Sequence, residues 1–370
     1  MPIPEQRDLE KARGIIAGWL AEQLPDATDI EVSELAGPAF TGFSNETLLF
    51  DASYTDAGGP RRTEGLVLRV KPTQHTVFME ADFESQYRVL DALGAKTDVP
   101  VPNMRWFEAS NEYLGAPFFV MDQVDGRAPS DSPPYTVGGW FFDETTPAQR
   151  RTLVVNGIDA LAGVHAVDWK ALGFEFLDKP QYGQLGFEQQ LRYYEKSYEW
   201  ADPGAEPPRV ARATLEWVQT NAPAQDPEIG LCWGDARINN QLFGPDYDVR
   251  AVLDWEMVTL ADPMMDLGWW LFLDRHFHEG MPAPRLEGFP TREEVVARYE
   301  QASGRSARDL EFYEIFGGLR FAVVMMRIKH LLVDFELMPP DTDMAENNAV
   351  TRVLADLLDI ESPGEGVPWE

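Results

Sequence analysis

The sequence predicts an α+β protein of two parts, an amino-terminal part built on an antiparallel sheet and a larger, mainly helical part. Two observations predict this division. Short alternating segments typical of strands dominate before Gly126, and long amphipathic helical patterns dominate after it. The chain has 370 residues and is 44% hydrophobic, which is enough to bury a sizeable core. We place the boundary so that residues 1–124 form the first lobe and residues 125–370 the second.

The first lobe begins with an amphipathic helix over residues 8–24, which Pro25 ends. The β-prone segments and the turns between them then predict a sheet with one helix inserted after its third strand. The expected strands are 30–35, 47–54, 65–70, 104–108 and 117–123, the glycine-containing turns are 37–45 and 56–60, and the inserted helix is 78–93.

The second lobe opens with a Pro/Ser/Asp-rich stretch at 128–134. Helical patterns then alternate with one short β-rich segment at 231–255. The clearest expected helices are 147–165, 187–200, 209–221, 291–302, 310–333 and 345–358.

Charge and cysteine usage exclude several classes of protein. The 62 acidic and 31 basic residues give a net charge of −31, which disfavours nucleic acid and anionic membrane as partners. A single cysteine, Cys232, excludes an intrachain disulfide. Neither a signal peptide nor an apolar run long enough to cross a membrane is recognisable. We therefore expect a soluble cytoplasmic protein that is a monomer or a homodimer.

The segment 231–256 contains the pattern that points to chemistry. Asp235 stands on an expected loop, Asn240 follows five positions later, and Asp254 ends an apolar strand after a turn at 244–246. Kinase-type phosphoryl transfer needs this layout. The loop aspartate accepts the proton of the attacking hydroxyl, while the asparagine and the second aspartate hold Mg²⁺ against the nucleotide phosphates.

The motifs Trp233-Gly234-Asp235 to Asn240, Val252-Leu253-Asp254-Trp255-Glu256 and Asp262-Pro263-Met264-Met265-Asp266-Leu267 resemble the aminoglycoside phosphotransferase family. That family has a protein-kinase-like fold of two lobes. The G-D-x-R-x-x-N and V-L-D-W-E patterns are most similar to a branch that includes kinase domains fused to acyl-CoA dehydrogenases. The resemblance implies an ATP- and Mg²⁺-dependent transfer to a hydroxyl of a small molecule, with GTP as an alternative donor.

The resemblance also implies roles for individual residues. Asp235 is the catalytic base, and Asn240 and Asp254 are the metal ligands. Arg237 is a candidate for contacting the transferred phosphoryl group, although an ion pair with Glu256 or Asp266 is an equally good reading.

On the nucleotide side, the resemblance implies that the 37–45 turn covers the phosphates through Gly42, Phe43, Ser44 and Asn45. Arg69 occupies the position of the family's phosphate-binding lysine, with Lys71 as the reserve candidate on the same strand face. Gln86 occupies the position of the helix glutamate. The carbonyl of Asp122 and the N–H of Val124 are expected to pair with the adenine edge.

Three departures from the family pattern motivate an alternative function. Trp233 replaces the usual loop histidine, Arg69 the lysine, and Gln86 the glutamate. We expect Trp233 to alter loop packing more than chemistry, but the same changes are compatible with a catalytically weak, nucleotide-binding pseudokinase or sensor. A metal-dependent hydrolase that uses Asp235, Asp254 and Glu256 is a second alternative.

The remaining candidates have mainly structural readings. We expect His165 to be a satisfied core histidine near the catalytic loop, and Asp266 to be a loop anchor rather than a ligand. His276 and His278 lack a third metal ligand. Aromatic residues are dense after Asp254, including Trp269, and either form helix–helix core or line an apolar acceptor pocket. Together with the V-L-D-W-E pattern, these aromatics favour a hydroxylated apolar metabolite or a hydroxyacyl thioester as the acceptor.

Overall fold

The computed structural model describes residues 7–37, 45–73, 75–80, 82–204, 206–223, 228–281 and 283–365. The chain divides into two compact units. The first comprises Met1–Ala95 and Pro102–Val124, and the second comprises Lys96–Val101 and Asp125–Glu370.

The first unit is built on an antiparallel sheet of five strands in the order β1-β2-β3-β5-β4. One helix precedes the sheet, and another is inserted after its third strand, as the sequence predicts. The elements are α1 (Leu9–Gln23), β1 (Thr28–Val32), β2 (Glu46–Thr55), β3 (Arg61–Val70), α2 (Phe83–Lys96), β4 (Met104–Glu108) and β5 (Phe118–Asp122).

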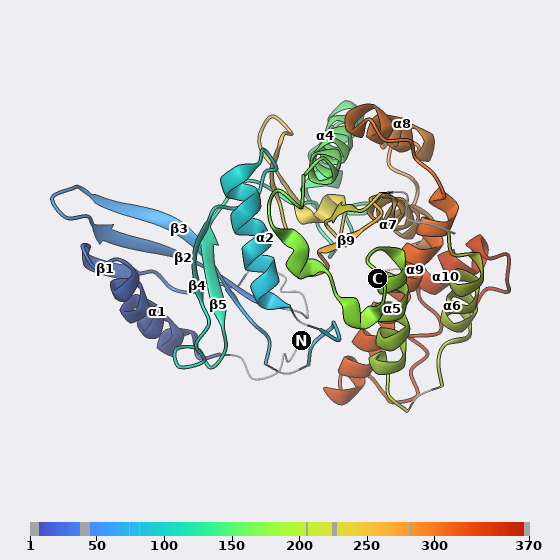
Figure 1. The fold of residues 1–370 in the computed structure, drawn as a ribbon, viewed down its shortest axis with the longest axis horizontal. Helices are drawn as coiled ribbons and strands as arrows, with labels where there is room; N and C mark the ends of the chain where they lie inside the picture. Colours follow the sequence, from blue (N-terminus) through green and yellow to red (C-terminus); the bar gives the residue numbers. More distant parts are fainter. Residues whose placement is uncertain are drawn as a thin grey trace. The chain divides into compact units, whose positions relative to one another are not determined.

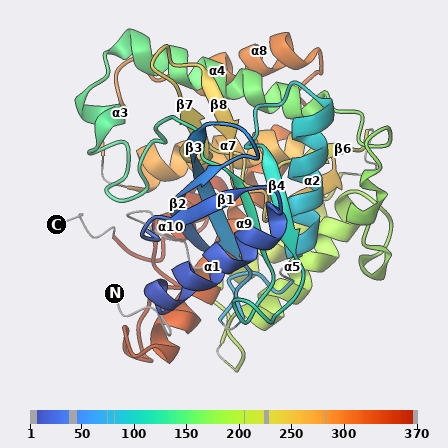
Figure 2. The same ribbon diagram turned by 90° about the vertical axis from the view of Figure 1, so that its left-hand side faces the viewer.

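Helix α1 covers one face of this sheet (Figures 1 and 2). Its buried residues Ile16 and Trp19 pack with Leu68 of β3 and Val120 of β5 in one apolar cluster. Side chains alternate between the two faces of a strand, so Leu66, Leu68 and Val70 belong to this core. The intervening residues of β3 therefore point to the opposite face.

Helix α2 covers that opposite face through aromatic contacts (Figure 1). The ring of Phe83 lies 4.8 Å from that of Phe119 on β5, and the ring of Tyr87 lies 6.0 Å from it. The helix begins at Phe83 rather than at residue 78. The cause is Asp82, whose side chain accepts a hydrogen bond from the backbone N–H of Ser85 and so caps the first turn.

The second unit is mainly helical, which confirms the predicted α+β class. The 25-residue helix α9 packs against α5, α6, α7 and α10. Among the described residues, no helix is both long enough and apolar enough to cross a membrane. The helices are α3 (Trp140–Asp143), α4 (Pro147–His165), α5 (Phe187–Ala201), α6 (Arg209–Asn221), α7 (Met264–Arg275), α8 (Arg292–Ser303), α9 (Leu310–Asp334) and α10 (Ala349–Leu357).

Short elements connect these helices and carry the candidate site. Strand β6 (Gly230–Cys232) pairs with β9 (Thr259–Ala261), and β7 (Gln241–Phe243) pairs with β8 (Val249–Val252). A 3₁₀ turn, η3 (Ile238–Asn240), immediately precedes β7. The other short helices are η1 (Phe174–Leu177), η2 (Pro180–Tyr182) and the π-turn η4 (His276–Gly280), which continues α7.

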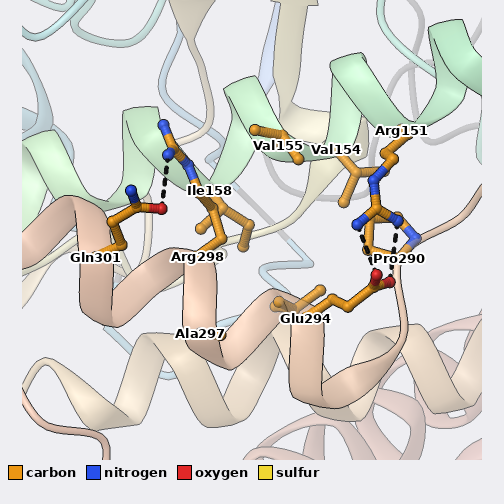
Figure 3. Close-up of a pocket in the computed structure, with 10 residues that line it drawn as sticks. Arg151, Val154, Val155, Ile158, Pro290, Glu294, Ala297, Arg298 and Gln301 are labelled. Atoms are coloured by element: carbon orange, nitrogen blue, oxygen red, sulfur yellow. Dashed lines mark hydrogen bonds and ion pairs between the residues drawn. The ribbon is translucent and has the colours of Figure 1, made fainter.

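A groove lies between α4 and α8, with Val154 and Ile158 in its floor (Figure 3). The charges around it are paired. Arg151 and Glu294 form an ion pair at 2.6 Å, and Arg151 lowers the pKa of Glu294 to about 2. Arg298 donates to Gln301 at 3.2 Å and pairs with Asp159. Such exposed pairs add little stability, whereas the fully buried side chains of Val154 and Ile158 contribute to the apolar core.

The core under α1 predicts that two substitutions in this helix differ in their effect on the free energy of unfolding. Ile16 is fully buried, whereas Leu9 in the same helix is 39% exposed. Ile16→Ala should lower the free energy of unfolding by about 2–5 kcal/mol, because it removes packed apolar atoms and leaves a cavity. Leu9→Ala should change it by less than about 0.5 kcal/mol. Chemical denaturation followed by circular dichroism measures both, and equal losses would show that α1 does not pack as described.

Candidate active site

The loop between β6 and β7 presents Asp235 with its carboxylate held by three donors. The amide Nδ2 of Asn240 donates to Oδ2 at 2.7 Å, and Nε of Arg237 donates to the same oxygen at 3.2 Å. The indole N–H of Trp269, on α7, donates to Oδ1 at 2.9 Å. The Asp235 side chain is 16% exposed, so the carboxylate is held in a fixed orientation but is not sealed from solvent.

The β7–β8 ribbon brings the end of the apolar strand back to the same loop. Gln241 pairs with Val252, and the N–H of Leu253 donates to the carbonyl of Asn240 at 2.8 Å. Asp254 is therefore one residue away from a direct backbone link to Asn240. Its own backbone lies in the left-handed region with φ of +59°, an uncommon conformation for a residue other than glycine that is often found at functional sites.

Arg237 is surrounded by carboxylates. Its Nη1 pairs with Asp131 at 2.7 Å, and its Nε pairs with Asp235 at 3.2 Å. Burial disfavours the charged guanidinium, but attraction by Asp235, Asp131 and Asp254 outweighs burial and raises the pKa of Arg237. The alternative prediction, an ion pair of Arg237 with Glu256 or Asp266, is wrong. The segment 128–134, which folds against the loop, supplies Asp131 instead.

Trp233, at the position of the family histidine, is fully buried and links the loop to the strand end. Its indole N–H donates to the carbonyls of Leu253 at 2.8 Å and Asp254 at 3.2 Å. Its ring packs 6.2 Å from that of Trp255. The substituted residue thus supports the loop by packing and by hydrogen bonds to backbone.

The carboxylate of Asp266, on α7, binds the backbone of the loop. Its Oδ2 accepts from the N–H of Trp233 at 2.6 Å, and its Oδ1 accepts from the N–H of Gly234 at 2.9 Å. Nε2 of His165 lies 3.1 Å from Oδ2, and Nδ1 of the same ring lies 2.7 Å from the hydroxyl of Tyr299. His165 is therefore the satisfied core histidine expected near the loop, and the carboxylate of Asp266 is committed to the loop backbone.

Gly234 is the position in this loop where only glycine fits. Its φ is +95°, and a Cβ there would lie 2.1 Å from the carbonyl oxygen of Met257. A side chain would push the loop away from the segment that follows Asp254. This close approach keeps Asp235 beside the end of the ribbon.

The donor set at the ribbon end suits a hard divalent cation such as Mg²⁺. Asn240 and Asp254 offer a carboxamide oxygen and a carboxylate, the ligand types that such cations prefer. Because Nδ2 of Asn240 is engaged by Asp235, the amide oxygen points away from that carboxylate. Among the described residues, no group of three or more His, Cys, Asp or Glu side chains could hold a metal ion by itself, so the amide of Asn240 would be needed here.

The nucleotide-side candidate on β3, Arg69, lies on the sheet face that α2 covers. Arg69 pairs across the sheet with Thr47 on β2 and with Phe119 on β5. Since cross-strand partners share a face, its side chain lies on the α2 side. Lys71 directly follows the last residue of β3. Gln86 is 4% exposed and follows Phe83 by three residues, so it points from α2 toward the same face.

The remaining nucleotide-side candidates lie at the ends of strands in the first unit. Asp122 ends β5, and its carboxylate accepts from Arg105 at 3.0 Å and from Asn103 at 2.9 Å. Val124 follows two residues later. Asn45 precedes β2 and is buried. Gly42, Phe43 and Ser44 lie outside the described residues.

Sequence reasoning did not assign three contacts around Asp235. Trp269 was expected to be core or pocket lining, Asp131 was placed only in the Pro/Ser/Asp-rich stretch at 128–134, and Arg320 only within the expected helix 310–333. Arg320 is 1% exposed, and its Nη2 donates to the carbonyl of Gly234 at 2.8 Å. One available signal was the spacing of Asp266 and Trp269, which puts both residues on one face of a helix.

Comparison with known sequences places the chain among phosphotransferases. The model of a family described as "Phosphotransferase enzyme family" matches residues 42–314. The probable acyl-CoA dehydrogenase IBR3 of Arabidopsis thaliana is 29% identical over 302 residues, which cover 76% of this chain and 34% of that protein. Acyl-CoA dehydrogenase family member 11 of Gallus gallus is 31% identical over 260 residues, which cover 70% of this chain and 30% of that protein. The chain thus spans about a third of the length of these curated relatives.

Solved structures extend the likeness to the fold. A Ralstonia eutropha protein provisionally named as an aminoglycoside phosphotransferase matches with a TM-score of 0.67 and 25% identity, covering 94% of this chain and 98% of that one. A thermostable mutant of aminoglycoside phosphotransferase APH(4)-Ia, in a ternary complex with ADP and hygromycin B, matches with a TM-score of 0.56 and 17% identity, covering 95% of this chain and 99% of that one. These likenesses confirm the predicted two-lobed, protein-kinase-like fold.

The anchoring role of Asp266 can be tested with a nearly isosteric change. In Asp266→Asn, one of the two carboxylate oxygens becomes an N–H₂ donor that faces a backbone N–H. Because Trp233 and Gly234 each donate to a different oxygen, neither orientation of the amide satisfies both. We expect a loss of about 1–3 kcal/mol in the free energy of unfolding, measured by chemical denaturation. The exposed Asp246→Asn serves as the matched control, and equal stability of the two variants would contradict the anchor.

A buried histidine next to this site makes stability depend on pH. His276 is 6% exposed, and its ring lies 5.0 Å from those of Phe277 and Phe321. Burial, with smaller contributions from the positive charges of Arg237 and Arg352, lowers the pKa of His276 from 6.5 to about 3. The unfolded imidazole therefore binds a proton below pH 6.5, whereas the folded one does not until about pH 3. Its contribution to stability is complete above pH 6.5 and is lost as the pH falls toward 3.

Replacing His276 should remove this dependence. At about pH 5 the wild type should have lost about 2 kcal/mol through this group, given ~1.4 kcal/mol per pH unit. His276→Phe keeps an aromatic ring but cannot titrate, so its free energy of unfolding should fall less between neutral pH and about pH 5. Denaturation curves at several pH values measure the difference. Parallel pH profiles for the two proteins would show that His276 does not contribute.

Proposed function

Because the chain belongs to the phosphotransferase enzyme family, we propose that it transfers the γ-phosphoryl group of ATP to a hydroxyl of a small molecule in a Mg²⁺-dependent reaction. One observation carries the proposal. Asp235 and Asn240 are in direct contact at 2.7 Å, and the β7–β8 ribbon returns Asp254 to the same place. Phosphoryl transfer needs these three side chains together.

Asp235 acts in this proposal as the base for the acceptor. Its carboxylate orients the hydroxyl and takes up the hydroxyl proton at one of its oxygens. The bond from the acceptor oxygen to the γ-phosphorus forms as the bond from that phosphorus to the β,γ-bridging oxygen breaks, and ADP leaves. Asn240 hydrogen-bonds to the same carboxylate, which aligns the base with the metal side of the site. Arg237 supplies a half-buried positive charge beside the developing negative charge of the phosphoryl group.

Asn240 and Asp254 would hold Mg²⁺ through oxygen, and the cation would supply charge neutralisation for the nucleotide phosphates. On the nucleotide side, we propose that Arg69 contacts the phosphates, with Lys71 as the reserve candidate. Gln86 replaces the glutamate of the family pattern with a neutral amide. The 42–45 turn would cover the phosphates, and the Asp122 carbonyl and Val124 N–H would meet the base of ATP or GTP.

The names of the relatives favour one class of acceptor. The matched part of the Arabidopsis and chicken proteins belongs to longer chains named as acyl-CoA dehydrogenases. A kinase domain joined to such an enzyme would act on a compound of the same pathway. We therefore propose a hydroxyacyl thioester, or a related hydroxylated apolar compound, rather than an antibiotic.

The direct test is turnover with a panel of acceptors. The purified chain is given Mg-ATP together with hydroxyacyl-CoA thioesters, apolar alcohols or an aminoglycoside. ADP formation and the mass of the phosphorylated product are then measured. Asp235→Asn should lower kcat by about 10²–10⁴-fold, because it removes the base. Nucleotide binding should persist, since the substitution lies outside the proposed phosphate-binding residues.

The controls separate the proposal from its alternatives. Asp246→Asn, in the exposed turn after β7, should retain wild-type turnover. Phosphate release without any acceptor, lost in Asp235→Asn, would indicate a hydrolase. Nucleotide binding with neither phosphate release nor a phosphorylated product would indicate a pseudokinase or sensor.

A further inference from the structure

The structure assigns a positioning role to Trp269: we propose that its indole N–H holds Oδ1 of Asp235, and that Arg320 in turn holds the indole. This inference rests on the proposed function, because it takes Asp235 as the base. The N–H to Oδ1 distance is 2.9 Å, and Trp269 is 4% exposed. An indole N–H can only donate, so Oδ1 serves this contact as an acceptor.

Arg320 fixes both the ring and the backbone next to the base. Its guanidinium lies 4.6 Å from the centre of the Trp269 ring, within the range of a cation–π contact. Its Nη2 donates to the carbonyl of Gly234, the residue before Asp235, at 2.8 Å. Its Nε donates to the hydroxyl of Tyr194 at 3.2 Å. One buried side chain therefore holds the side-chain donor and the main chain of the catalytic loop in register.

The burial of Arg320 supports a dedicated role. The side chain is 1% exposed, and Nη1 has no hydrogen-bond partner within the described ranges. A buried guanidinium with an unsatisfied nitrogen is costly for stability. An apolar residue of similar size would fill the same space without that cost. Its contacts to Gly234 and Trp269 are what an apolar residue could not reproduce.

The backbones of α7 and α9 approach closely at this point, which limits movement of the indole. A Cβ on Gly317 of α9 would lie 3.2 Å from Cα of Trp269. A Cβ on Gly268 of α7 would lie 2.4 Å from the backbone of Tyr313. These two glycines allow the helices to pack at backbone contact, so Trp269 is mounted on a rigid pair of helices.

Helix α7 thus contacts the loop through two side chains, one that accepts hydrogen bonds and one that donates. Asp266 accepts from the loop backbone, and Trp269, one turn later, donates to the loop side chain. A base held from both ends loses less rotational freedom when the acceptor binds. The expected kinetic consequence of losing the indole N–H is a lower kcat, with little change in nucleotide affinity.

Trp269→Phe tests this consequence, because it keeps an aromatic ring for Arg320 and removes the donor. With the best acceptor of the panel, kcat should fall by about 10–100-fold, while KM for ATP and the Kd for Mg-ADP stay within about twofold. Trp169→Phe is the matched control. Its indole N–H donates to the carbonyl of Ile229 at 3.0 Å, away from the loop, and kcat should not change. An unchanged kcat in Trp269→Phe, or a loss confined to KM and thermal stability, would overturn the proposal.

A spectroscopic measurement on the full chain tests the contact without turnover. The protein is labelled with ¹⁵N-tryptophan, and the signal missing in Trp269→Phe, or in Trp269→Tyr if that variant does not fold, identifies Trp269 among the 11 tryptophans. Replacing Asp235 by Ala should shift this signal more than any other indole signal. A Trp269 signal that stays in place would overturn the inference.

The two readouts also separate this inference from the proposed function. If no acceptor is phosphorylated by the wild type, the proposed function fails. The shift of the Trp269 signal in Asp235→Ala then still decides whether the indole holds the carboxylate.

Discussion

The arrangement of the candidate site depends on one buried interaction, the carboxylate of Asp266 with the backbone N–H groups of Trp233 and Gly234. A fully buried carboxylate is costly unless its oxygens are satisfied, and here each oxygen accepts from the loop. His165 adds a further contact, and it is held in turn by Tyr299 and, through its carbonyl, by Arg305 at 2.8 Å. The loop is thus attached to α7 before any side chain of the candidate site is considered.

The rest of the site combines local and long-range connections. Asp235, Asn240 and the end of β8 are brought together by a short ribbon, which needs only a few backbone hydrogen bonds. Asp131 and Trp269 arrive from segments that are distant in sequence. The β7–β8 ribbon determines that Asp235, Asn240 and Asp254 lie close together. Asp131 adds negative charge beside Arg237, and Trp269 fixes the orientation of the Asp235 carboxylate.

The sequence predicted well what local pattern controls. Helix α4, helix α6 and strand β4 have the predicted bounds, since capping residues, prolines and alternation define their ends. The start of α2 was missed because the cap at Asp82 outweighs the apolar pattern before it. The grouping of Asp235 with Asn240 followed from spacing. The partner of Arg237 and the burial of Arg320 did not, because both depend on the packing of distant segments, which periodicity does not encode.

The aromatic side chain of Trp233 has a consequence for the chemical environment in which the loop can work. Histidine, the residue of the related pattern, changes charge near neutral pH, and a loop supported by it can respond to acidity. Indole does not ionise in this range, and its N–H is shared by the carbonyls of Leu253 and Asp254. The hydrogen bonds that connect the loop to the strand end therefore do not depend on pH in this range.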